Sequence, residues 1–331
     1  MKTGKKVMIL LLVFVAAAMV YFVHPVGKKE EHGVTEYTAM EKAKFPVLYA
    51  TMGEREMAPV FGQTDERGVT AGRDSLILLP EDRKLKLRFA GTTKIQGVHY
   101  EIRSLDTEDL IERTRIGSFE TSLNGDSENA LSTELPIQNL LTEESEYRLT
   151  IAIATEKHPA IYFYTRVMWQ QESRVQEMVD LAVSFSEKTF DYDSARELTT
   201  YLETDPNADN SSLGHVTLKS DFSQLTWKGL SMERVSEPEI HLRELQGIIG
   251  TIDLKYVVSE MKDGKAAAYY DVIESFTMKL GAQRIYMMNY DRRADQIFTG
   301  ESSAYSGDRI QLGVSDAEDL QSMQDEAGKY R

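Results

Sequence analysis

The chain has 331 residues, with 53 acidic against 38 basic side chains, a formal net charge of −15 at pH 7, and no cysteine. The absence of cysteine excludes disulfides, thiolate metal sites and a lipid-acylated cysteine. The acidic balance opposes binding to a phosphate backbone, so we expect no nucleic-acid partner.

The first element is an uncharged apolar run, VMILLLVFVAAAMVYFV, at residues 7–23. A helix of this length rises roughly 25 Å, near the lower limit for crossing a bilayer. Lysines precede the run without acids, whereas Lys28 and Lys29 beyond it are followed by two glutamates, which favours a cytoplasmic N-terminus. We therefore predict a single-pass membrane protein whose bulk is extracytoplasmic.

A cleaved signal peptide is the alternative, because Ala16-Ala17-Ala18 offers a small-residue cleavage site. The apolar run continues past that site to Val23, which favours an uncleaved signal-anchor. Residues 1–26 are then the cytoplasmic stub and transmembrane anchor. Residues 27–44 are charged and aperiodic and read as a juxtamembrane stalk.

Residues 45–169 have the pattern of a β domain. Apolar and charged side chains alternate strictly from Lys84 to Phe89, as in a half-buried strand. Short strands at such regular spacing predict an antiparallel β-sandwich. Further strands are expected at residues 98–105, 110–119, 130–135, 146–154 and 161–169.

One local motif in this domain has a family resemblance. Leu141 stands six residues before Tyr147, which opens an alternating strand through Leu149, Ile151 and Ile153. The arrangement resembles the tyrosine corner of fibronectin type III and related immunoglobulin-like domains, and covers about residues 74–169. It implies that the Tyr147 phenol hydrogen-bonds to backbone a few residues upstream. Domains of this kind are commonly spacers or binding modules.

Residues 170–204 change to a helical period. An apolar stripe recurs every three or four residues from Val175 to Phe185, which predicts a helix that packs against a core. A capping box at Ser194–Glu197 then predicts a second, short helix up to about Glu203. We interpret the two as a helical linker between β domains.

Residues 205–331 return to strand patterns, and we predict a second antiparallel β domain, either a sheet, a sandwich or part of a propeller. Asp263-Gly264, between two long alternating runs, is the strongest hairpin signal in the chain. The strands are expected at residues 215–219, 224–228, 239–245, 250–261, 267–280 and 284–290.

No cofactor is predicted, and calcium is the one cation with a candidate site. Asp205, Asn207, Asp209 and Ser211 place an oxygen at every second residue, as calcium loops do. The turn glycine and the bidentate glutamate of an EF-hand are missing. An Asx-rich turn that bonds its own backbone is the alternative reading.

Catalytic motifs fail in their context, since the S-x-x-K match at Ser259–Lys262 lies on a predicted strand and no histidine pair has metal-ligand spacing. The leading hypothesis is a membrane-anchored, non-enzymatic interaction or scaffold protein of the cell envelope. Its partner would be a protein in or at the membrane or cell wall. Tyr269 and Tyr270, adjacent on a strand and so on opposite faces, are the candidate partner-binding residues.

Two other functions remain open on this sequence. One is a cell-envelope glycan-active hydrolase that uses a carboxylate pair, which leaves no fixed spacing in sequence. The other is a sensor or regulatory subunit of a membrane complex.

Overall fold

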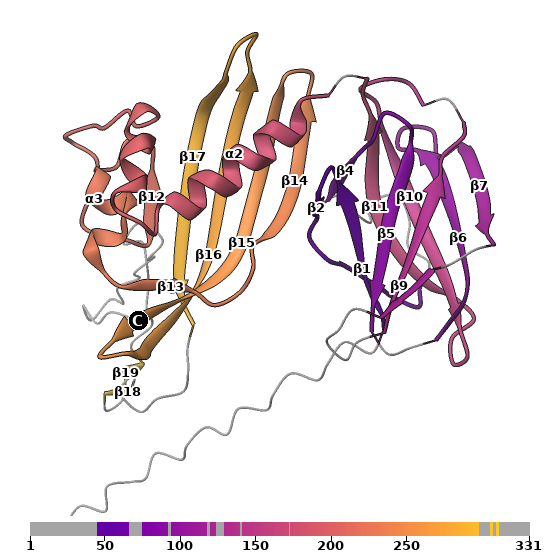
Figure 1. Ribbon diagram of the computed structural model, residues 1–331, viewed down its shortest axis with the longest axis horizontal. Helices are drawn as coiled ribbons and strands as arrows, with labels where there is room; N and C mark the ends of the chain where they lie inside the picture. The colour runs from indigo at the N-terminus through magenta and orange to yellow at the C-terminus, as the bar shows by residue number, and fades with distance from the viewer. Residues whose placement is uncertain are drawn as a thin grey trace, which may run out of the picture. The chain divides into compact units, whose positions relative to one another are not determined.

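The computed structural model describes residues 45–65, 75–91, 94–117, 120–123, 129–139, 141–171, 173–297, 305–306 and 309–310 (Figure 1). Over these ranges the fold is mainly β, with several antiparallel sheets. The helices in them are too short or too polar to cross a bilayer. The predicted anchor and stalk and most of the region after Ile297 lie outside the described residues.

Two sheets with a shared core form the first domain. The first sheet has the order β2-β1-β5-β9-β8, and β3 also pairs with β1. Its strands are β1 (Val47–Met52), β2 (Arg55–Glu56), β3 (Val60–Phe61), β5 (Lys84–Ala90), β8 (Glu120–Leu123) and β9 (Asn129–Pro136).

The second sheet has the order β4-β11-β10-β6-β7. Inward-facing side chains such as Leu87 of the first sheet and Leu149 of the second lie in one cluster of buried residues, as period-two alternation requires. The strands of this second sheet are β4 (Leu76–Leu79), β6 (Ile95–Ser104), β7 (Leu110–Ile116), β10 (Glu146–Thr155) and β11 (Ile161–Trp169).

Strand β4 departs from the predicted antiparallel arrangement, because it pairs parallel to β11. All four of its residues are buried. Ile77 and Leu79 belong to the core of the first domain, whereas Leu76 and Leu78 belong to the second hydrophobic cluster. A strand buried on both faces is continuously apolar and shows no alternation, which is why the sequence pattern did not predict it.

The second domain is one antiparallel sheet with helical segments packed against it (Figure 1). The strand order is β12-β17-β16-β15-β13, and β14 also pairs with β15. The elements in chain order are α2 (Val175–Lys188), η1 (Ser194–Thr200), β12 (His215–Thr217), α3 (Phe222–Leu225), η2 (Trp227–Gly229), β13 (Met232–Arg234), β14 (Glu239–Gln246), β15 (Ile249–Lys262), β16 (Lys265–Leu280) and β17 (Ile285–Gln296). Separately, β18 (Tyr305–Ser306) and β19 (Arg309–Ile310) form a short two-stranded ladder.

Helix α2 is a layer of this domain, which corrects the reading of residues 170–204 as a linker. Its apolar stripe is buried, and the Phe185 ring packs 5.6 Å from Phe276 and 4.9 Å from Tyr290. The predicted capping box does not form. Glu197 instead pairs with Lys188 at 2.6 Å, and the segment that contains it, Ser194–Thr200, is a 3₁₀ helix.

The strand predicted at residues 224–228 is also wrong, because this segment is helical in α3 and η2. Leu225 and Trp227 alternate with polar residues, and both are buried. In so short a run, the two-residue period of a strand cannot be distinguished from the 3.6-residue period of a helix. Positive φ at Trp227 and Lys228 marks the bend between the two helical pieces. The predicted hairpin is confirmed: Asp263 and Gly264 both have positive φ between the paired Lys262 and Lys265, as a type I′ turn requires.

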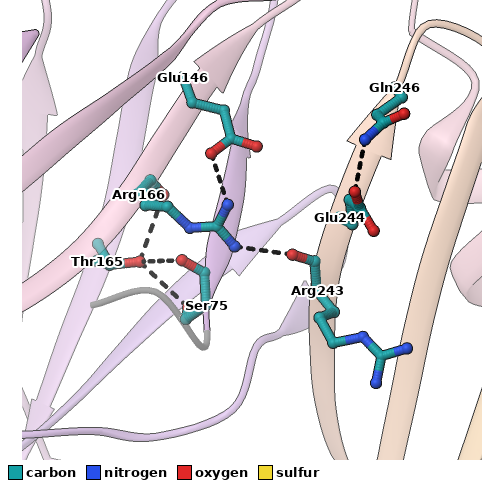
Figure 2. Close-up of polar contacts among 7 residues, drawn as sticks. All are labelled: Ser75, Glu146, Thr165, Arg166, Arg243, Glu244 and Gln246. Atoms are coloured by element: carbon teal, nitrogen blue, oxygen red, sulfur yellow. Dashed lines mark hydrogen bonds and ion pairs between the residues drawn. The ribbon is translucent and has the colours of Figure 1, made fainter. Parts of the chain in front are cut away.

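Both β domains lie in a compact unit that includes Glu41–Ile297, and polar contacts join them. Figure 2 shows the Arg166 guanidinium between the Glu146 carboxylate, at 2.5 Å, and the backbone oxygen of Arg243, at 2.7 Å. The Ala58 amide also donates to the Ile240 carbonyl at 2.8 Å. The first domain therefore contacts β14 through both backbone and side-chain bonds.

Candidate functional site

The two faces of the second sheet differ in whether helical segments pack against them. Val272, Phe276 and Met278 of β16 face the helical layer and are buried. On the opposite face, which we call the open face, Tyr269 and Ile273 are 36% and 43% exposed. Tyr286 pairs with Lys279, shares that face and is 44% exposed. Apolar side chains thus stand among polar ones on a sheet surface that no described helix packs against.

Tyr269 and Tyr270, the predicted partner-binding pair, point to opposite faces of β16. Tyr269 lies on the open face, whereas Tyr270 packs partly buried against the cluster beneath the helical segments. The Tyr270 hydroxyl donates to a Glu260 oxygen at 3.4 Å, and burial, followed by that carboxylate, raises the pKa of the phenol. Tyr270 also lines a cavity of about 70 Å³ with Trp227 and Met232. Of the two side chains, Tyr269 is therefore the more exposed contact residue.

Polar contacts between side chains brace the open face. Asp253 is nearly buried, accepts a hydrogen bond from Ser275 and pairs with Arg243 at 3.0 Å. His215 of β12 meets Asp291 of β17 at 2.6 Å. These contacts hold neighbouring strands in register and keep the polar part of the face satisfied.

A groove of about 630 Å³ lies between α2, the end of η1 and the start of β17. This volume is within the range of ligand sites. We call it the β17 groove. Its apolar and aromatic lining is Leu181, Tyr201, Leu202, Ile285, Tyr286 and Met287, and its charged lining is Arg174, Glu177, Asp180, Glu203 and Arg284.

A buried polar cluster beneath the helical layer was not found from the sequence. Glu274 and Arg292 are cross-strand neighbours, and neither is exposed. Arg292 donates to the carbonyl oxygens of Gln224 and Leu225 and lies 3.6 Å from the centroid of the Trp227 ring. Because its hydrogen bonds go to backbone at the end of α3, we assign it a structural role.

The phenols beside this cluster are strongly perturbed. Tyr290 donates to Glu274 at 2.7 Å, and burial, with the Glu274 charge second, raises the pKa of Tyr290 well above its usual value. Burial also raises the pKa of Tyr256, whose hydroxyl is bonded to Ser186. Both phenols are therefore neutral at physiological pH and act as hydrogen-bonding groups of the core.

In the candidate calcium loop, several of the oxygens are used within the loop itself. An Asp205 oxygen accepts from the Asn207 amide at 2.9 Å, and an Asp209 oxygen accepts from the Ser211 amide at 2.8 Å. Bonds from Ser211 lower the pKa of Asp209. These are Asx turns, the alternative reading of the loop.

Tyr147 and Leu141 occupy the first domain's core. The backbone amide of Thr142 donates to the Tyr147 hydroxyl at 2.9 Å, five residues upstream. The bond lies where the corner motif predicts it, but the phenol oxygen accepts rather than donates. In β6, the fully buried Tyr100 bonds to Glu112 and to the Pro136 carbonyl, and burial raises its pKa.

No family model and no curated protein matches this chain. Among solved structures, CopC from Methylosinus trichosporium OB3b is 13% identical, and the match covers 30% of this chain and 87% of that one at a TM-score of 0.20. Spo0M, a sporulation control protein from Bacillus subtilis, is 6% identical over 74% of this chain and 90% of that one, at a TM-score of 0.19. At such scores neither likeness supports an inference about this protein.

Proposed function

We propose that the protein is a membrane-anchored, extracytoplasmic interaction or scaffold protein without enzymatic activity, and that its second domain binds a protein partner. The observation that carries the proposal is the open face, where Tyr269, Ile273 and Tyr286 are exposed on a sheet braced by ion pairs. Tyrosine is enriched in interfaces because it offers a large apolar area and a polar tip at low entropy cost.

The first domain is proposed as an immunoglobulin-like spacer. Its neighbouring strands β8-β9-β5-β1 and β7-β6-β10-β11 follow the D-E-B-A and C′-C-F-G orders of that fold. The bond between Thr142 and Tyr147 supports the same assignment. A spacer next to the anchor would hold the second domain away from the membrane.

The anchor itself is proposed from the uncharged run at residues 7–23 and the lysines before it. Protease added to intact cells should digest residues 45–331 while the mature N-terminus remains Met1. A soluble product that begins near Met19 would show signal-peptide cleavage instead.

Partner binding is tested by co-purification from detergent-solubilised native membranes, with the full chain as bait. The Tyr269→Ala variant should lose the captured protein, with a melting temperature within about 2 °C of the parent. Tyr192→Ala is the matched control, because Tyr192 is 58% exposed and lies in the turn between α2 and η1, where its ring contacts Phe222. Equal capture by Tyr269→Ala and the parent chain would refute the open face as the binding surface.

A further inference from the structure

We propose that the β17 groove binds an extended segment of a partner protein, which pairs with the free edge of β17 and places a carboxylate against Arg284. This inference rests on the proposed protein-binding function of the second domain. It concerns the edge of β17, which shares Tyr286 with the open face but not Tyr269, so variants of Arg284 and Tyr269 test the two proposals separately.

The edge of β17 is only partly covered. β12 pairs with Asp291–Arg293, and the Ala294 amide donates to Gly214. Among the described residues, no backbone group bonds the same edge of Ile285–Asn289. A bulge at Met288 interrupts the strand, so regular pairing is available at Ile285–Met287, beside the groove.

Apart from the bulge at Met288, this edge lacks the usual protection of an exposed strand. Lysine, proline and inward-pointing charges commonly block pairing with another chain. Residues 285–290, with the sequence IYMMNY, contain none of these. Met288 is 56% exposed, and Tyr286 is 44% exposed. An uncharged, unpaired edge next to a groove is the arrangement used in β-strand addition.

The charged residues of the groove indicate which charges the bound segment carries. Arg174 is paired with Glu177 at 2.7 Å, and Asp180 is paired with Arg55 at 2.8 Å. Arg284 lies 4.4 Å from the centroid of the Tyr286 ring and has no carboxylate partner among the described residues. A carboxylate of the bound segment would form an ion pair with the Arg284 guanidinium.

Glu203 is the remaining groove charge for which the described residues offer no ion-pair partner. The complementary segment therefore also carries one basic residue. Its alternate side chains would meet the partly buried Leu181, Tyr201 and Leu202, since successive residues of a strand face opposite sides. The occupant is thus an extended, amphipathic segment with one acid and one base.

The test pans phage-displayed random dodecapeptides against the full chain in detergent. Enriched peptides should show period-two apolar residues and an aspartate or glutamate. A synthetic copy should bind Arg284→Gln about tenfold more weakly than the parent chain. Arg293→Gln is the matched control, an exposed arginine on the same strand but on the open face. Bound peptide should also slow amide hydrogen exchange at Ile285–Met287.

Several results would overturn the proposal. One is enrichment of no peptide, or of peptides that bind Arg284→Gln as tightly as the parent and leave those amides unprotected. Dimerisation that protects Ile285–Met287 without peptide would assign the edge to a second copy of the chain. Peptide binding that requires deletion of residues 298–331 would assign it to the chain's own tail. Loss of peptide binding in Tyr269→Ala would assign the peptide to the open face instead.

Discussion

Replacing Arg292 by methionine tests how the segment around α3 is held on the second sheet. The Arg292 side chain has no exposed surface, and its guanidinium donates to the carbonyl oxygens of Gln224, at 2.8 Å, and Leu225, at 3.0 Å. It also stacks on the Trp227 ring. Methionine has a similar length and can fill the space, but it leaves the two carbonyl groups without these donors.

The expected cost is large for one residue. Hydrogen bonds from a charged donor contribute about 1.5–3 kcal/mol each, and Glu274, directly opposite, loses the nearby cation. Breaking a buried charge arrangement by removing one partner costs about 3–5 kcal/mol. We therefore expect Arg292→Met to lower the free energy of unfolding by about 4 kcal/mol, or the melting temperature by roughly 10 °C.

The assay is urea unfolding of the full chain in detergent, followed by tryptophan fluorescence. Arg293→Met, at the exposed neighbour, should change stability by under about 0.5 kcal/mol. The double variant Glu274→Gln/Arg292→Met should cost less than the sum of its single variants, because no uncompensated buried charge remains. A cost below about 1 kcal/mol for Arg292→Met, or strict additivity, would refute the reasoning.

Three further outcomes are expected. Tyr147→Phe should cost about 1 kcal/mol in urea unfolding, the net value of one hydrogen bond, and an unchanged midpoint would contradict the corner bond. Burial, followed by the charge of Lys255, lowers the pKa of His241 below 6.5 in the folded protein. Neutral His241 therefore contributes its full stability above pH 6.5, and this contribution is lost as the pH falls through the folded-state pKa. The melting temperature of His241→Gln, measured as a function of pH, should lack this decline on the acid side. If calcium binds the loop, Asp205→Ala should lower the melting temperature only with calcium present, whereas equal parent melting temperatures with calcium and with chelator would exclude the site.

Elements with one buried face could be predicted from the sequence alone. Strict alternation identified β5, and the strand at residues 161–169 was predicted with the bounds of β11. The α2 stripe and the Asp263-Gly264 turn were also read correctly, because helical periodicity and positive φ at a two-residue turn leave local signals. The charge, the missing cysteine and the apolar run at residues 7–23 bounded the function classes in the same way.

Only the tertiary structure determined those features whose neighbours come from distant parts of the chain. Each face of β4 packs against a hydrophobic core, so its sequence shows no alternation of apolar and polar residues. Its parallel partner, β11, is far away in sequence. Nothing in the sequence pairs Glu274 with Arg292 until β16 and β17 align. The β17 groove likewise exists only because η1 and α2 pack beside a strand edge that β12 leaves uncovered. Local periodicity reports which face of an element is buried, but only the assembled fold determines what that face meets.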